Sequence, residues 1–257
     1  MAKVIAVTNQ KGGVGKTTTT VNLSAILAEK GYKTIIIDSD PQGNSTSSLG
    51  INKKLETSLY DVLIDEDTKI KDTLKKTDIY NLEICPSNIN LAGAEVELVS
   101  LMSREQRLRN QLDTIRDEYD YILIDCPPSL GLITLNALTA ADSVLIPIQC
   151  EYFALEGLAQ LSSTINLVKK HLNRNLELEG AILTMYDSRT NLSNSVVNEV
   201  KEYFKGNVFN TAIPRNVKLS EAPSYGMPIN TYDAKSSGAQ AYYKLADELV
   251  EKQNTKE

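Results

Sequence analysis

A glycine-rich stretch near the start of the chain, KGGVGKTT at residues 11–18, carries groups that can bind phosphate. Its glycines allow backbone N–H groups to turn inward around phosphate oxygens, and a helix that begins near Gly15 adds the positive end of its dipole. The Lys16 ammonium can lie on the β- and γ-phosphates of a nucleotide, and the Thr17 hydroxyl can ligate Mg²⁺. The sequence therefore predicts a nucleotide site formed by Lys11, Gly12, Gly13, Val14, Gly15, Lys16, Thr17 and Thr18.

The loop departs from the common pattern G-x-x-x-x-G-K-[ST] at its first position. Residue 10, where the pattern has glycine, is Gln10, and glycines stand at positions 12 and 13 instead. A second lysine, Lys11, precedes them. An apolar run comes before the loop and a helix-compatible segment follows it, which is the context that a phosphate loop requires. The change at residue 10 therefore does not alter the prediction of a phosphate loop. The role of Lys11 is not explained by the common pattern.

Three aspartates stand where predicted strands end. Asp38 and Asp40 follow an apolar run in IIIDSDPQGN (35–44), and Asp125 ends another in YILIDCPPS (121–129). The carboxyl ends of parallel strands meet at the edge of the sheet where the phosphate loop also lies. Carboxylates there can hold Mg²⁺ directly or through water, and they can orient a water molecule for attack on a phosphoryl group.

The elements that must position these residues alternate along the chain as short apolar runs and longer helix-compatible segments. The apolar runs are continuous, which is typical of strands that are buried on both faces of a parallel sheet. We therefore expect one α/β domain over residues 1–257, with a mostly parallel, twisted β-sheet flanked by helices on both faces. The expected strands are 3–8, 33–38, 82–86, 120–125, 143–148, 180–185 and a further candidate, 207–214.

Two helices can be bounded from the sequence. The first should begin near Gly15 and end just before Gly31, since glycine is a common residue after a helix end. The last lies in SSGAQAYYKLADELVEKQNTKE, where Ser236 or Ser237 can cap an amphipathic helix. We expect the residues from about 251 to 257 to form a flexible polar tail.

Composition excludes several classes of protein. A net charge of −6 argues against a chain that coats nucleic acid over its whole surface, although a local basic patch can still bind it. No apolar run approaches the ~18–20 residues that span a membrane, and the start lacks the features of a signal peptide. His171 is the only histidine, which nearly excludes histidine-based metal sites and catalytic triads. The three cysteines form no C-x-x-C pair and are expected to be buried and reduced.

The chain as a whole resembles the ParA/MinD class of P-loop ATPases, and KGGVGKTT is similar to the deviant Walker A motif of that class. The resemblance implies a Mg²⁺-dependent ATPase with ATP and Mg²⁺ as cofactors. It also implies a face-to-face homodimer when ATP is bound, in which Lys11 reaches the ATP phosphates of the partner subunit. A lysine in that position neutralises transition-state charge much as an arginine finger does.

The same resemblance assigns roles to the aspartates. DSDPQGN (38–44) is similar to switch I of ParA proteins, in which Asp40 positions the hydrolytic water and Asp38 lies near the metal. ILIDCPP (122–128) is similar to the Walker B and switch II region, which puts Asp125 in the magnesium shell. Gly131 in PSLGLIT is a candidate flexible point. The implied catalytic residues are Lys11, Lys16 and Asp40, and the implied metal-binding residues are Thr17, Asp38 and Asp125.

Three later segments resemble chromosomal-type ParA proteins of the Soj branch, namely CEYFALEGL (150–158), LTMYDSRTNLS (183–193) and IPRNVKLSEAPSYGMPI (213–229). In that branch the last segment lies against adenine. Pro214 and Asn216 are therefore expected to contact the base, with Met185 packed nearby.

Basic residues concentrate between 169 and 218, where eight lysines and arginines stand against five acids. Phosphate contacts from such a patch give salt-dependent, sequence-independent affinity for DNA. By resemblance to the Soj branch, Arg189 and Lys218 bind double-stranded DNA without sequence preference. Lys218 stands where arginine is more usual, which keeps the charge and loses bidentate geometry.

The resemblance to the Soj branch implies an ATP-dependent DNA-partitioning switch. ATP binding would drive dimerisation and DNA binding, and hydrolysis stimulated by a ParB-like centromere-binding protein would reset it. The expected location is the cytoplasm, in association with the nucleoid. Two alternatives stay open, a MinD-like membrane-cycling regulator and an ATPase that positions a protein cargo. The acidic end of the chain, LADELVEKQNTKE, argues against a membrane partner.

Overall fold

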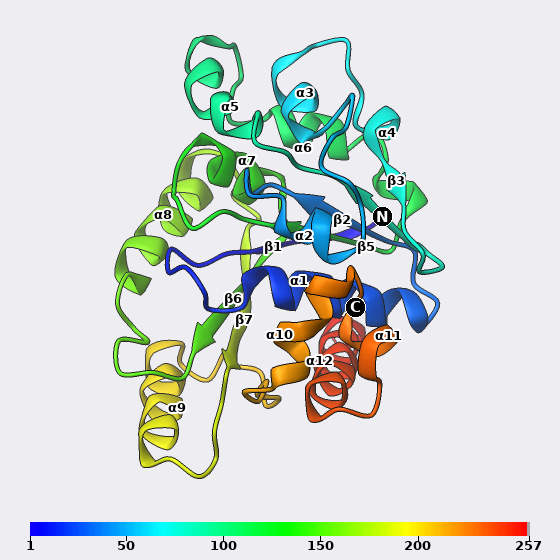
Figure 1. Cartoon of the computed structure of the whole chain (residues 1–257). Helices are drawn as coiled ribbons and strands as arrows, with labels where there is room; N and C mark the ends of the chain where they lie inside the picture. Colours follow the sequence, from blue (N-terminus) through cyan, green and yellow to red (C-terminus); the bar gives the residue numbers. More distant parts are fainter. Residues whose placement is uncertain (256–257) are drawn as a thin grey trace.

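The strand before the phosphate loop, β1 (Lys3–Val7), lies inside a seven-stranded sheet of order β3-β4-β2-β5-β1-β6-β7 (Figure 1). This computed structural model describes residues 1–255. Each neighbouring pair of strands is parallel except β3 and β4, which are antiparallel. The predicted fold class, a mostly parallel α/β sheet with helices on both faces, is confirmed.

Six of the predicted strands are present, and their ends lie close to the predicted ones. Besides β1 they are β2 (Thr34–Asp38), β4 (Leu82–Cys85), β5 (Tyr121–Asp125), β6 (Ser143–Gln149) and β7 (Glu177–Thr184). The short edge strand β3 (Lys75–Lys76) was not predicted, because two lysines carry no apolar signal.

The further candidate strand, 207–214, is wrong as a regular strand. Within this segment only isolated bridges form, Ala181 with Val208 and Tyr186 with Pro214. Between them the backbone turns to another partner, since the N–H groups of Asn210 and Thr211 donate to the carboxylate of Glu248 at 2.6 and 3.0 Å. A helix carboxylate thus takes the hydrogen bonds that a continuous strand would have given to β7.

Alternate residues of β1 face two different cores. Val4 and Ala6 pack with the helices on one face of the sheet, and Ile5 and Val7 pack with α1 and α12 on the other. The first face carries α3 (Leu59–Ile64), α4 (Ile70–Thr73), α5 (Leu91–Glu97), α6 (Arg107–Leu112), α7 (Leu132–Ala140), α8 (Leu158–His171) and α9 (Asn191–Tyr203). The second carries α1 (Lys16–Glu29), α10 (Val217–Glu221), α11 (Ile229–Asp233) and α12 (Ser237–Asn254), with α2 (Asn44–Ser48) against α1. Short 3₁₀ turns are η1 (Leu98–Ser100), η2 (Arg116–Glu118) and η3 (Ala222–Tyr225).

Both predicted helix boundaries can be compared with the structure. Helix α1 starts directly after Gly15 and ends before Gly31, whose φ of +99° is one that glycine adopts without strain. Helix α12 is capped by Ser236, whose hydroxyl accepts from the N–H of Ala239. It continues to Asn254, so residues 251–254 are helical, while residues 256–257 lie outside the described part of the chain; the flexibility of the tail stays a prediction.

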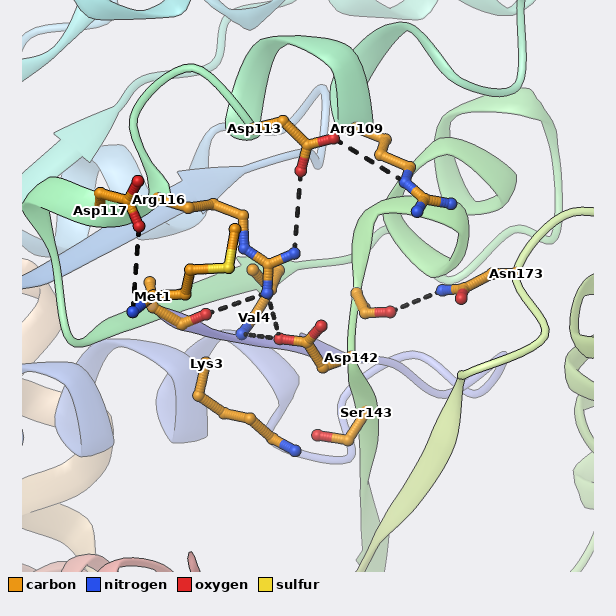
Figure 2. Close-up of polar contacts among 12 residues, drawn as sticks. Met1, Lys3, Val4, Arg109, Asp113, Arg116, Asp117, Asp142, Ser143 and Asn173 are labelled. Atoms are coloured by element: carbon orange, nitrogen blue, oxygen red, sulfur yellow. Dashed lines mark hydrogen bonds and ion pairs between the residues drawn. The ribbon is translucent and has the colours of Figure 1, made fainter. Parts of the chain in front are cut away.

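A polar network joins the start of β1 to the start of β6, at the edge of the sheet opposite the phosphate loop (Figure 2). Arg116 Nη2 donates to Asp142 Oδ2 at 2.6 Å and to the carbonyl of Ala2 at 3.0 Å. The N–H of Val4 donates to the same oxygen of Asp142 at 2.8 Å. Since the Arg116 side chain is only 15% exposed, water competes weakly for these contacts.

Asp142→Ala is expected to lower the free energy of unfolding by about 2 kcal/mol, because it removes the nearer of two charged partners of Arg116 and the acceptor of Val4 N–H. Urea unfolding followed by circular dichroism measures the change. Asp117→Ala is the matched control, because that carboxylate is 83% exposed and lies 4.0 Å from the amino-terminal nitrogen. The control should stay within about 0.5 kcal/mol of the parent; equal losses in both variants would contradict the role of the network.

Candidate functional site

The phosphate loop lies at the carboxyl end of β1, where β1 is flanked by β5 and β6. The strand register places Val7 beside Asp125, the last residue of β5, and Asp125 in turn lies beside Asp38, the last residue of β2. The sheet therefore brings the loop and two of the three predicted aspartates to one place, although they are far apart in the sequence. Carboxyl ends of neighbouring parallel strands are where such folds bind ligands.

The backbone of the loop is shaped by glycines at two positions. Gly13 and Gly15 have φ values of +74° and +90°, a region that other residues rarely adopt. The Thr184 hydroxyl at the end of β7 donates to the carbonyl of Val14 at 2.8 Å and ties the loop to the sheet. Gly12 and Gly13 are exposed, so their side of the loop is open to a ligand.

Lys16 is buried at the first position of α1. Its ammonium donates to the carbonyl of Lys11 at 3.0 Å, across the loop. Burial lowers the pKa of Lys16, and the negative charges of Asp125 and Asp40 act against that shift. A buried cation with one carbonyl as its acceptor is stabilised strongly by an anion in the loop. The sequence predicts such a contact, between the Lys16 ammonium and the phosphates of a nucleotide.

Asp125 is fully buried, and only one of its two carboxylate oxygens has a hydrogen-bond donor. Oδ2 accepts from the Ser45 hydroxyl at 2.7 Å, whereas Oδ1 has no hydrogen-bond partner. Burial raises the pKa of Asp125, and the nearby Thr17 hydroxyl and Lys16 ammonium oppose that shift. An orphaned buried carboxylate oxygen beside a threonine hydroxyl is the donor set that Mg²⁺ prefers.

Asp38 is also fully buried, but its oxygens already have partners within the chain. Oδ2 accepts from the backbone N–H and the hydroxyl of Thr46, at 2.8 and 2.7 Å, and Oδ1 lies 3.3 Å from the N–H of Asp40. Burial and the charge of Asp125 raise the pKa of Asp38. Asp38 therefore lies beside the predicted metal ligand Asp125, and its carboxylate holds the segment 40–46 through hydrogen bonds.

Asp40 lies on the turn that leads from β2 to α2. Its Oδ1 accepts from the N–H of Gln42 at 2.9 Å, which fixes the turn, and its charge acts on both Lys16 and Asp125. Gly43 follows with a φ of +58°, and a Cβ there would stand 2.9 Å from the carbonyl of Ser87. The turn thus presents a half-exposed carboxylate to the site from a fixed backbone.

Lys11, the extra lysine of the loop, is held by its own subunit. Its ammonium forms an ion pair with Glu151 and lies 3.4 Å from the carbonyl of Phe153. Its N–H donates to Asn9 Oδ1 at 3.0 Å. The backbone of the residue is therefore anchored, while the half-exposed side chain is bound by a carboxylate that a phosphate can replace.

The three predicted base-binding residues lie on two segments that a bridge between Tyr186 and Pro214 joins. Met185 has an unusual φ of +51°, and the next residue, Tyr186, bridges Pro214. Asn216 caps α10 through its carbonyl oxygen, which accepts from the N–H of Lys218 at 2.8 Å, and its amide donates to Ser237. A cavity of about 480 Å³ beside Pro214 and Ser237 opens between this segment and α12.

The two predicted DNA-binding residues are exposed and paired. Arg189, 85% exposed, donates from Nε and Nη2 to the two oxygens of Asp187 at 2.9 and 2.7 Å. These hydrogen bonds lower the pKa of Asp187 to about 2, so it is charged at neutral pH. Lys218 pairs with Glu221 at 3.0 Å and lies over the ring of Tyr232. Neither residue contributes to the core, so both basic groups lie at the surface.

Three residues of the site were not predicted. Ser45 and Thr46 supply hydroxyl donors to Asp125 and Asp38, and Glu151 holds Lys11. The run NSTSS after the Asp40 turn offered a signal, because hydroxyl groups near buried carboxylates are natural donors. Among residues 1–255 no three histidine, cysteine, aspartate or glutamate side chains gather into a metal cluster.

Comparison with known proteins agrees with this geometry. A family described as AAA domain matches residues 2–178. The chain is 58% identical over 251 residues to the sporulation initiation inhibitor protein Soj of Bacillus subtilis, covering 97% of this chain and 99% of that one. It is 53% identical over 257 residues to the chromosome partitioning protein ParA of Myxococcus xanthus, covering 100% and 90% of the two chains.

Two solved structures show the same fold with nucleotide present. Cobyrinic acid a,c-diamide synthase from Mycobacterium smegmatis, with bound ADP and magnesium, has 40% identity and a TM-score of 0.89, covering 100% of this chain and 97% of that one. The septum site-determining protein MinD of Pyrococcus horikoshii, complexed with Mg-ADP, has 28% identity and a TM-score of 0.80, with 100% and 99% covered.

Thr46→Val is expected to lower the free energy of unfolding by about 2 kcal/mol, because the hydroxyl both donates to Asp38 and accepts from the N–H of Ser87 at 3.0 Å. Valine keeps the shape and leaves two buried polar groups without that partner. Ser47→Ala on the same helix is the control, since the Ser47 hydroxyl bonds only carbonyls within its own turn among the contacts described. Chemical denaturation of both variants measures the difference, and a stable Thr46→Val protein would speak against this account.

Proposed function

Because this chain belongs to the ParA/Soj family of partition ATPases, we propose that it is a switch that binds ATP with Mg²⁺, dimerises, binds DNA and resets by hydrolysis. The observation that carries the proposal is the fully buried Asp125 carboxylate, whose Oδ1 has no partner within hydrogen-bond distance and which interacts with the Thr17 hydroxyl and the Lys16 ammonium. A nucleotide phosphate with its magnesium ion would satisfy all three groups at once.

In this proposal different residues of the site bind the phosphates, hold the metal ion and position the attacking water. Lys16 and the backbone of residues 11–18 bind the phosphates, and Thr17 and Asp125 hold the metal. When bound there, Mg²⁺ would neutralise charge on the phosphates. Asp40 orients the water that attacks the γ-phosphate, while Asp38 fixes the turn that carries Asp40, since its Oδ1 lies 3.3 Å from Asp40 N–H. Positioning of this kind is the main contribution that a protein makes to phosphoryl transfer.

Lys11 acts in the proposed dimer. Its ammonium leaves Glu151 of its own chain and reaches the phosphates of the ATP bound by the partner subunit. The half-exposed position of Lys11 at the mouth of the loop supports this, because an exposed ion pair contributes little stability and is easily exchanged. ATP would thus become part of the interface and would control whether two subunits join.

Adenine is proposed to lie against Met185, Pro214 and Asn216. These residues come from two segments that the Tyr186–Pro214 bridge holds side by side. The side-chain amide of Asn216 already serves α10 and Ser237, so we expect its backbone and the ring of Pro214 to meet the base.

The surface that binds DNA is proposed to include Arg189 and Lys218. Each is exposed and pairs with a carboxylate close to it in sequence, which a DNA phosphate can replace. Dimerisation would double the patch and raise its affinity through multivalency. The location that follows is the nucleoid within the cytoplasm, and the partner that stimulates hydrolysis is a ParB-like centromere-binding protein. No helix within residues 1–255 has the length and apolar character needed to cross a membrane.

Asp40→Ala is expected to stay bound to ATP as a dimer and to hold DNA, because it removes the carboxylate that orients water and leaves the phosphate contacts in place. DNA affinity measured with ATP and with ADP across a salt series tests this. The logarithm of the affinity should fall with the logarithm of salt at about −0.9 per phosphate contacted. Turnover at the parent rate would remove Asp40 from the mechanism, and absence of DNA binding with either nucleotide would refute the DNA-bound state.

Arg189→Glu and Asp187→Asn should change DNA affinity in opposite directions. The first reverses a phosphate-binding charge and is expected to weaken binding by about tenfold, and the second frees the Arg189 guanidinium and should strengthen binding by about threefold. Lys71→Glu is the control, because Lys71 carries the same charge and pairs with Glu118 on another part of the surface. ATP-dependent dimerisation should be unchanged in all three, and a loss of dimerisation in Arg189→Glu would assign that residue to the interface instead.

A further inference from the structure

A carboxylate from α5 holds the start of α7. Glu95 Oε2 accepts from the N–H of Leu132 at 2.7 Å, and Oε1 lies 3.3 Å from the N–H of Ile133. These are the first two residues of α7, whose N–H groups have no partner within the helix. A negative charge at this end also interacts favourably with the helix dipole. Glu95 is therefore the acceptor for this helix end, although it comes from a separate helix.

The segment between Asp125 and α7 is fixed at both ends. At its start, the N–H and hydroxyl of Ser39 donate to the carbonyl of Asp125 at 3.0 and 2.7 Å, and the N–H of Cys126 donates to the carbonyl of Val7. Pro127 and Pro128 follow and stiffen the segment. At its end, Glu95 holds the first turn of α7. A displacement of that turn would consequently be transmitted toward Asp125 through a short, stiff connection.

Gly131 is adapted to this contact. A Cβ on Gly131 would stand 2.4 Å from Glu95 Oε2, closer than atoms can approach. The φ of Gly131 is −81°, so the glycine is needed for the approach of the carboxylate and not for backbone freedom. On the other side, Leu91, Ala94 and Leu98 bury α5 and its continuation in the core, so Glu95 is presented from a fixed element.

We propose that Glu95 is a positioning residue for ATP hydrolysis, an inference that rests on the proposed function. It acts through the α7 start and the segment 126–131 on the placement of Asp125. Most of the proposed phosphate contacts come from the phosphate loop, whereas the hydrogen bonds described for Glu95 run to the start of α7. Removal of Glu95 is therefore expected to lower turnover much more than the apparent affinity for ATP, a separation that a merely structural contact would not produce.

Steady-state ATP hydrolysis with Mg²⁺ and DNA tests the role in the full chain. Glu95→Ala is expected to lower kcat by about twofold to thirtyfold, the range that corresponds to a lost helix cap acting on the barrier, with KM within about twofold of the parent. Glu95→Gln keeps one acceptor oxygen, so its kcat should lie between that of the parent and that of Glu95→Ala. Glu97→Ala, which lies on the same helix and loses a contact to the exposed Tyr60 hydroxyl, should keep the parent kcat.

Gly131→Ala adds a second, independent arm. With Glu95 present, the added Cβ displaces the carboxylate and should lower kcat as Glu95→Ala does. In the double variant the clash is gone, so kcat should equal that of Glu95→Ala alone, which is a non-additive result. Additive losses, an unchanged kcat in Glu95→Ala, or equal changes in kcat and KM would each overturn the inference. A parent chain with no ATP turnover would overturn the proposed function, and this inference with it.

Discussion

The interaction on which the rest of the structure depends is the burial of opposite charges at the carboxyl end of the sheet. Asp38 and Asp125 end neighbouring strands and are fully buried, with the Lys16 ammonium close to Asp125. Burial alone raises the pKa of both carboxyl groups and lowers that of the lysine, so each group is costly to keep charged without a partner. A phosphate supplies a negative partner for Lys16, and its metal ion supplies a positive partner for the carboxylates. Nucleotide binding is therefore favoured at this site.

The same site is connected to several other elements of the fold. Three segments that follow strands meet at this point: the phosphate loop after β1, the turn 39–43 after β2 and the segment 126–131 after β5. Each is held by side chains from another element, Thr184 for the loop, Thr46 for the turn and Glu95 for the third. Hydrogen bonds therefore connect the centre of the site to elements on both faces of the sheet, α2 on one and α5 on the other.

The residues expected to contact other molecules share a different property. Lys11, Arg189 and Lys218 are all partly or largely exposed, and each is paired with a carboxylate of its own chain. Exposed pairs of this kind contribute little to stability, because water screens them. They keep flexible basic side chains in defined places and can be exchanged for phosphate groups at small cost. The proposed contacts with other molecules thus use exposed ion pairs, whereas the nucleotide site within one subunit uses buried charges.

The sequence by itself determined the parallel α/β class, six of the strands, the ends of α1 and the phosphate loop, because these depend on local periodicity, on glycine and on short motifs. The sequence also predicted that Asp38, Asp40 and Asp125 lie at one edge of the sheet, because the carboxyl ends of parallel strands meet there. Only the tertiary structure decided that Thr46 takes both contacts of one Asp38 oxygen, that Glu248 interrupts the strand expected at 207–214 and that Glu95 holds α7. Those three choices are hydrogen bonds between residues distant in the sequence or on separate elements. A single sequence offers candidate donors, such as the hydroxyls of NSTSS, but does not show which donor a given carboxylate will meet.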